Sequence, residues 1–165
     1  MDRGQKMIFL TDTAEDTTAF GERLAEMLKP GDTVLLQGDL GAGKSVLARG
    51  IARGMGVRCP MPSPTFTLMI PYRTDDTVVY HFDLYRITDE DEYFAAGLDE
   101  YIGTDGVALV EWPETVDLQP EHSLQIFIEP AGEGTGRRIR IENDGVAGYA
   151  PERLERWRWR DGSGT

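Results

Sequence analysis

One glycine-rich stretch constrains this chain more than any other. Residues 38–45 read Gly-Asp-Leu-Gly-Ala-Gly-Lys-Ser and match the pattern G-x-x-x-x-G-K-[ST] at every position. The apolar run Val34–Gln37 precedes this loop, and Val46–Ala52 follows it with helix-forming residues. A strand, a glycine loop and a helix in this order are typical of a phosphate-binding loop. The pattern predicts an α/β fold, because an apolar strand of this kind suits a buried parallel sheet.

The residue types of the loop explain how it would bind phosphate. Its glycines allow backbone conformations that a Cβ atom would block, so successive N–H groups can turn toward an anion. The helix that begins at the loop directs its positive dipole end to the same point. We expect Lys44 to contact the β- and γ-phosphates and the Ser45 hydroxyl to ligate Mg²⁺. The predicted nucleotide-binding set in this stretch is Gly38, Asp39, Leu40, Gly41, Ala42, Gly43, Lys44, Ser45 and Val46.

Length and charge limit the classes of partner. The chain has 165 residues, which is enough for one compact domain and short for two. No apolar run approaches the length of a membrane span, and the first residues lead into no signal-type stretch, so we expect a cytoplasmic protein with no membrane partner. The formal net charge of −12 makes direct binding to tRNA or DNA unfavourable, because phosphate contacts supply most of that affinity. A basic protein surface is compatible with this charge.

The end of the chain differs in composition from the rest. Residues 151–160 combine four arginines with Trp157 and Trp159, a mixture that can mark RNA contact. A short amphipathic end helix is the favoured interpretation. We therefore assign residues 1–150 to a single domain and residues 151–165 to a short helix and flexible tail.

The segment before the first predicted helix, Ala14–Leu28, has two interpretations. Thr11, Asp12 and Thr13 are all residue types that cap helix N-termini, and capping alone explains them. The same loop also lies where Thr11 could border an adenine pocket. We include Thr11 among the candidate nucleotide-binding residues.

A proline-rich loop follows the phosphate-loop helix. Pro60, Pro62 and Pro64 stand at alternate positions, so the segment must be extended and stiff up to Thr65. In nucleotide-switch proteins, an extended loop at this point presents a threonine hydroxyl to Mg²⁺ and the γ-phosphate. A rigid surface connector is the alternative interpretation of the prolines.

Two predicted strands end in carboxylates. Asp83 closes the strand Thr77–Asp83, and Glu111 follows the apolar strand Gly106–Val110. A carboxylate at a strand end is the position that holds or orients Mg²⁺ in phosphate-loop enzymes. Asp83 and Glu111 are therefore both candidates to hold Mg²⁺ or one of its water ligands. His81 is interpreted as a hydrogen-bonded structural residue rather than a base.

Two further side chains complete the candidate set. Trp112 follows Glu111 at the strand end and could stack on a base, or it could cap the core. Arg137 begins a predicted strand and could reach a phosphate or a ribose, although a plain surface arginine is the default. The only asparagine is Asn143, so the N-K-x-D element of guanine-specific proteins is absent and adenine is favoured.

Four motifs resemble one family when they are taken in order. They are the phosphate loop at 38–45, Ser-Pro-Thr-Phe-Thr-Leu at 63–68, His-Phe-Asp-Leu-Tyr-Arg at 81–86 and Glu-Trp-Pro at 111–113. Together they are similar to the TsaE (YjeE) family of bacterial ATPases, which are required for the N6-threonylcarbamoyladenosine (t6A) modification at tRNA position 37. The resemblance covers about residues 7–142. Ser45 stands where many members have threonine, which keeps the hydroxyl.

The resemblance implies a fold and a role for each matching position. It implies a three-layer P-loop NTPase-like fold with a mixed, mainly parallel sheet. Lys44 and the loop amides would hold the phosphates of ATP or ADP, Ser45 and Glu111 would hold Mg²⁺, and Thr65 would belong to a switch-like loop. Asp83 would support hydrolysis and Trp112 would lie near the base.

The resemblance also implies a partner. Members act on a heterodimer of the tRNA threonylcarbamoyl transferase subunit and its paralogous partner (TsaD and TsaB), and do not perform the transfer themselves. We expect weak hydrolysis by the isolated chain and stimulation by that complex, with Arg86 as the candidate residue at the γ-phosphate. A small-molecule kinase is the runner-up, and a nucleotide-sensing module whose hydrolysis is incidental is the third interpretation.

Overall fold

The computed structural model describes residues 7–160, so the predicted flexible tail at 161–165 lies outside the described residues. The strands are β1 (Met7–Thr11), β2 (Thr33–Gln37), β3 (Met69–Arg73), β4 (Val78–Asp83), β5 (Val107–Glu111), β6 (Ser123–Pro130) and β7 (Arg137–Asp144). The α-helices are α1 (Ala14–Ala25), α2 (Lys44–Gly54) and α3 (Glu90–Ala95). Three 3-10 helices, η1 (Leu98–Tyr101), η2 (Pro113–Val116) and η3 (Pro151–Trp157), complete the elements.

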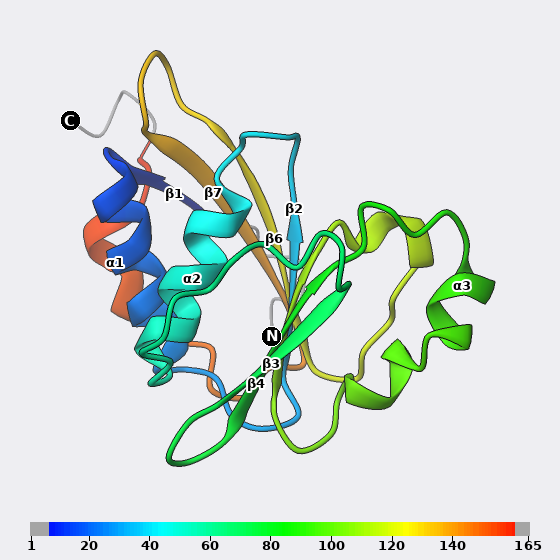
Figure 1. The fold of residues 1–165 in the computed structure, drawn as a ribbon. Coiled ribbons are helices and arrows are strands. Elements are labelled where there is room, and N and C mark those ends of the chain that lie inside the picture. The colour runs from blue at the N-terminus through cyan, green and yellow to red at the C-terminus, as the bar shows by residue number, and fades with distance from the viewer. Residues whose placement is uncertain (1–6, 161–165) are drawn as a thin grey trace.

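All seven strands join in one sheet of order β1-β7-β6-β2-β5-β4-β3. The four central strands β6, β2, β5 and β4 are parallel, whereas β7, β1 and β3 pair antiparallel with their neighbours. Helices α1 and α2 cover one face of the sheet, and α3 lies on the other side (Figure 1). The structure thus confirms the predicted α/β class with a mixed, mainly parallel central sheet.

The central strands are buried because their sequences are apolar on both faces. Residues 107–110 of β5 are fully buried, and every residue of β4 is buried. Successive side chains of these strands point to opposite faces of the sheet and pack in two separate clusters. One cluster lies under α1 and α2, and the other lies under α3 and η1. Asp83 and Glu111 are the last residues of β4 and β5, and the register of the two strands pairs them at the carboxyl edge of the sheet.

Helices α1 and α2 pack closely against each other. A Cβ atom at Gly50 would lie 2.6 Å from the carbonyl oxygen of Thr18, so only glycine permits this approach. Thr13 caps α1 by accepting a hydrogen bond from the backbone N–H of Asp16. The helix ends at Ala25 rather than at the predicted Leu28, because the N–H groups of Met27 and Leu28 bond three residues back and tighten the last turn.

The C-terminal segment packs onto α1. Leu154 and Trp157 of η3 are buried in the same core as Phe20, and the Trp157 ring meets the Phe20 ring edge-on at 5.3 Å. The Trp157 indole N–H donates to Asp16 at 2.8 Å. The backbone N–H of Trp159 donates to the carbonyl oxygen of Ile8, so the chain runs along the outer edge of β1. The predicted short end helix is therefore a 3-10 helix whose apolar side belongs to the main core.

No helix within residues 7–160 is both long enough and apolar enough to cross a bilayer.

This packing predicts that residues 151–159 contribute to the stability of the whole domain. We expect Trp157→Ala to lower the free energy of unfolding by about 3–5 kcal/mol, because it leaves a cavity against Phe20 and removes the indole hydrogen bond to Asp16. Trp159→Ala is the matched control, since its ring is 42% exposed and should cost less than about 1 kcal/mol. Urea unfolding measures both, and equal midpoints would contradict the assignment.

Candidate nucleotide-binding site

The phosphate loop joins the carboxyl end of β2 to the start of α2. Gly41 and Gly43 have φ values of +79° and +104°, a region that side chains rarely adopt. A Cβ atom at Gly38 would overlap the carbonyl oxygen of Ile128. Gly43 is the N-cap of α2 and offers no side-chain cap, so the first N–H groups of the helix have no such partner. These donors and the helix dipole together favour an anion at this point.

The Lys44 side chain is held inside its own loop. Its ammonium donates to the carbonyl oxygen of Gly38 and lies 3.2 Å from the centroid of the Trp112 ring. Burial lowers the pKa of Lys44, and the nearby carboxylates of Glu111 and Glu114 act against that shift. The ammonium is therefore kept beside the loop by one carbonyl and one aromatic face.

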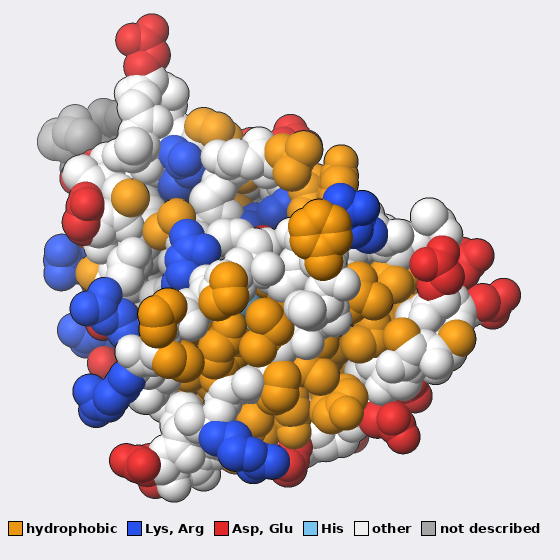
Figure 2. Space-filling model, in the orientation of Figure 1, with side chains coloured by type: hydrophobic (Ala, Val, Ile, Leu, Met, Phe, Trp, Pro, Cys, Tyr) orange, Lys and Arg blue, Asp and Glu red, His pale blue; other side chains and the backbone are white. Residues whose placement is uncertain are grey.

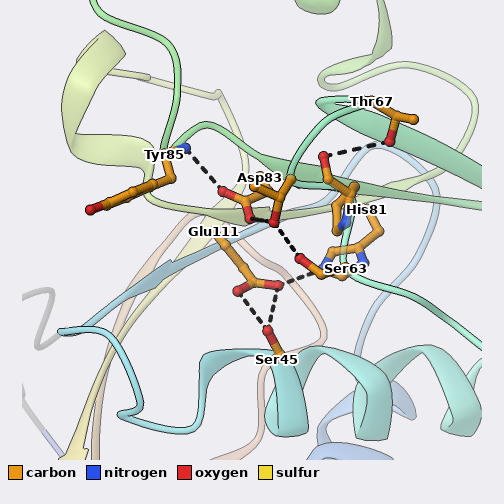
Figure 3. A network of polar contacts seen from close by, with 9 residues as sticks. Ser45, Ser63, Thr67, His81, Asp83, Tyr85 and Glu111 are labelled. Carbon is orange, nitrogen blue, oxygen red and sulfur yellow. Dashed lines mark hydrogen bonds and ion pairs between the residues drawn. The ribbon is translucent and has the colours of Figure 1, made fainter.

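The two strand-end carboxylates lie side by side. In the sheet register, Glu111 pairs with Leu36 on one side and with Asp83 on the other. Because β2 leads into the loop, this register brings Glu111 next to Ser45, and Asp83 lies beyond Glu111 on the neighbouring strand (Figure 3). The Ser45 hydroxyl donates to Glu111 at 3.0 Å and 3.3 Å. Asp83 and Glu111 are only 6% and 3% exposed, so both carboxylates depend on protein hydrogen bonds for their solvation.

His81 is the second partner of Glu111. The two side chains are buried, and His81 Nε2 lies 2.6 Å from Glu111 Oε2. His81 pairs in register with Leu109, two residues before Glu111, so the alternation of the strands places both side chains on one face of the sheet. The sequence indicated a hydrogen-bonded histidine but could not name its partner, because strand order and register are not visible in one sequence.

Thr65 reaches the other carboxylate. Its hydroxyl donates to Asp83 Oδ2 at 3.2 Å and lies 2.7 Å from the Ser63 hydroxyl. The backbone N–H of Tyr85 donates to Asp83 Oδ1 at 2.9 Å. The loop at 57–64 has no regular secondary structure, as the three prolines predicted, and it delivers Thr65 to the strand end. The structure thus brings Thr65 and Asp83 together beside the Ser45–Glu111 pair.

Ser45 and Glu111 fit a Mg²⁺ ion only as part of a larger ligand set. Among residues 7–160, no group of three or more His, Cys, Asp or Glu side chains is arranged to hold a metal ion. Mg²⁺ typically takes one or two protein oxygens and completes its shell with phosphate oxygens and water. A hydroxyl and a carboxylate 3.0 Å apart beside a phosphate loop match that chemistry.

Trp112 lies at the phosphate end of the site. Its backbone is left-handed, with φ +59°, and its ring packs against Tyr85 at 4.8 Å and faces Lys44. In this arrangement the ammonium covers one face of the indole ring. Stacking of Trp112 on a base therefore stays a prediction.

Arg137 and Thr11 differ in what they offer a ligand. Arg137 donates to the carbonyl oxygen of Gly41 at 3.3 Å, so its guanidinium lies against the phosphate loop. Its Nε atom is buried and has no hydrogen-bond partner among the described residues. Thr11 is 2% exposed, and its hydroxyl bonds to that of Thr17 at 2.7 Å. The Thr11 side chain is engaged within the fold, and its contact with adenine stays a prediction.

The remaining loop positions differ in exposure. Leu40 is 70% exposed at the loop tip, Asp39 is exposed, Ala42 is buried and Val46 is half-buried on α2. Contacts of these residues with a nucleotide stay predictions.

The His81–Glu111 contact predicts a requirement for His81 in metal binding. We expect His81→Leu to raise the Mg²⁺ concentration needed for tight ADP binding by about 10–100-fold, because Glu111 loses the bond that fixes its orientation. His81→Gln retains an N–H donor and should recover part of the loss. Calorimetric titrations of ADP at several Mg²⁺ concentrations measure this, with Mg²⁺-free ADP binding as the internal control. An unchanged Mg²⁺ requirement in His81→Leu would disprove the role.

The Lys44–Trp112 contact predicts a spectroscopic signal. A phosphate that binds in the loop should draw the ammonium away from the indole face, so we expect tryptophan emission to change on addition of Mg²⁺-ADP. The change should vanish in Trp112→Phe and persist in Trp159→Phe, whose ring lies near Arg138 instead. A signal that survives Trp112→Phe would contradict this prediction.

Comparisons with known proteins identify the family of this chain. The family model described as Threonylcarbamoyl adenosine biosynthesis protein TsaE matches residues 11–139. The TsaE protein of Bacillus subtilis is 44% identical to this chain, and the match covers 74% of this chain and 77% of that protein. The TsaE protein of Mycobacterium leprae is 33% identical, and the match covers 91% of this chain and 89% of that protein. The crystal structure of Bacillus subtilis YdiB superposes with a TM-score of 0.71 at 33% identity, over 92% of this chain and 93% of that one. The matched region contains the phosphate loop, both strand-end carboxylates and the proline-rich loop, and the chain belongs to the TsaE family of threonylcarbamoyladenosine biosynthesis proteins.

Proposed function

We propose that this chain is a Mg²⁺-dependent ATPase that supports the t6A modification of tRNA by acting on the transferase heterodimer. The observation that carries the proposal is the convergence of Lys44, Ser45, Asp83 and Glu111 at one edge of the sheet. A phosphate loop alone would bind a nucleotide. The adjacent carboxylates add groups for a metal ion and for a water molecule.

Binding of ATP and Mg²⁺ falls to the loop and to one carboxylate. The N–H groups around Gly43 and the Lys44 ammonium would hold the phosphates, and Ser45 and Glu111 would hold the ion. Mg²⁺ supplies positive charge that stabilises the phosphate oxygens during hydrolysis. His81 keeps Glu111 in place through the 2.6 Å contact.

Asp83 is suited to position the attacking water. Thr65 and the backbone of Tyr85 fix the orientation of its carboxylate, one donor on each oxygen. Carboxylate oxygens accept more than one hydrogen bond, so each retains capacity for a water proton. In phosphoryl transfer, positioning and charge stabilisation supply nearly all of the catalysis.

The position of Arg86 favours slow ATP hydrolysis by the isolated chain. Arg86, the candidate for stabilising the γ-phosphate, places its guanidinium 4.4 Å from the centre of the exposed Phe66 ring. Phe66 follows Thr65 directly, so a protein that covers Phe66 would act on both Arg86 and the Thr65 loop. We therefore propose that the transferase heterodimer stimulates hydrolysis. A cytoplasmic setting accords with this task.

We expect ATP turnover by the isolated chain to be slow, with an increase of at least about tenfold on addition of the heterodimer. Steady-state phosphate release measures both, with GTP as the control for base selectivity. Fast turnover that the heterodimer leaves unchanged would contradict the proposal, and transfer of phosphate to a small molecule would favour a kinase.

Comparison of two variants separates an ATPase from a nucleotide-sensing module. Asp83→Asn should retain ATP binding but lose most of the hydrolysis and the support of tRNA modification, whereas Lys44→Ala should lose binding itself. Normal tRNA modification with Asp83→Asn would show that hydrolysis is dispensable.

A further inference from the structure

A groove with a basic rim lies beside the phosphate-loop helix α2 and shares Val46 with the candidate nucleotide-binding residues. It runs between the start of α1, the outer face of α2 and the proline-rich loop, and has a volume of about 770 Å³. Arg49, Arg53 and Arg58 are exposed around it, and Val57 and Met61 form an apolar floor. We refer to this region as the arginine groove. Figure 2 shows basic side chains gathered on the α2 side of a broad hydrophobic area.

The spacing of residues on α2 explains the groove. Arg49 and Arg53 stand four residues apart, so they share the helix face opposite the buried Leu47 and Ile51. Arg58 extends the same charge beyond the helix end. Arg53 lies 3.9 Å from Glu22, and Arg49 and Arg58 form no ion pair with any residue in 7–160. In a chain of net charge −12, this is a concentration of weakly paired positive charge.

We propose that the arginine groove docks an acidic, partly apolar segment of the transferase heterodimer. Three arginines attract carboxylates, and the apolar floor adds area that a free phosphate ion would not use. Pro60 stiffens the wall of the groove, and Pro62 and Pro64 stiffen the chain that follows, so the wall loses little conformational entropy when a segment binds. The inference rests on the proposed function, since it names the surface used for that partner.

The same features make RNA a poorer occupant. Single-stranded bases need aromatic faces for stacking, and the lining residues include none. Glu15 lines the groove and Glu22 lies beside Arg53, so a phosphate backbone long enough to bind tightly would also meet negative charge. A short acidic segment needs no stacking surface and can direct its carboxylates to Arg49 and Arg58.

The position of the groove links docking to catalysis. Val46, at one end of the groove, follows Ser45 directly, and the wall at 60–61 leads along the chain to Thr65. A segment seated here would contact the elements that carry the candidate metal ligand and the Thr65–Asp83 contact. Docking would therefore stiffen the switch-like loop near the γ-phosphate position.

Charge removal in the groove tests the inference. We expect the variant Arg49→Gln/Arg53→Gln/Arg58→Gln to bind the purified heterodimer at least about tenfold more weakly than the wild type, with a flatter salt dependence. Its affinity for Mg²⁺-ADP and its circular dichroism spectrum should be unchanged. The control Arg153→Gln/Arg156→Gln removes two charges from η3 at residues that do not line the groove, and it should bind the heterodimer normally.

Three outcomes would overturn the inference. Equal heterodimer affinity in the groove variant and the control would exclude the groove as the docking surface. A groove variant that keeps heterodimer affinity but loses tRNA binding would identify RNA as the occupant. A wild-type chain that does not bind the heterodimer would refute the proposed function itself, and the inference with it.

Discussion

The hydrogen bond between Ser45 and Glu111 holds the two halves of the site together. Ser45 belongs to the phosphate loop and α2, whereas Glu111 belongs to the strand next to the one that feeds the loop. The bond exists because β2 and β5 are parallel neighbours, so the end of one lies beside the loop that leaves the other. A change in this pairing would separate the loop from both carboxylates, and the site would reduce to an anion cradle.

Burial gives this bond its importance. Glu111 is 3% exposed and receives its hydrogen bonds from Ser45 and His81, so the protein replaces nearly all of its water. Asp83, on the next strand, likewise accepts hydrogen bonds from the Thr65 hydroxyl and the backbone N–H of Tyr85. Each carboxylate therefore has a fixed orientation before any ligand arrives, a form of preorganisation that favours electrostatic catalysis.

Much of this site could be predicted from the sequence, because its chemistry is local. The loop motif indicated Lys44 and Ser45, and apolar strands that end in an acid indicated Asp83 and Glu111. His81 was predicted as a hydrogen-bonded residue, but its partner Glu111 was not, because that residue stands 30 positions away across a register that a single sequence does not contain. Trp112 was expected near a base, but the position of its ring follows from a left-handed backbone that the sequence did not suggest. The composition of the C-terminal segment predicts a short end helix, but it does not indicate that Leu154 and Trp157 pack in the main core.

Pro71 and the backbone bond from Trp159 to Ile8 have a consequence for how this protein can associate. An open sheet presents unpaired N–H and C=O groups at both edges and can recruit a further strand from another chain. Here the exposed Pro71 removes a donor from the edge strand β3, and the C-terminal segment lies along the edge of β1. Strand addition is thereby hindered at both ends of the sheet. A stable partner would therefore bind side chains on the helix and loop surfaces. Its recognition would depend on charge and shape rather than on backbone pairing.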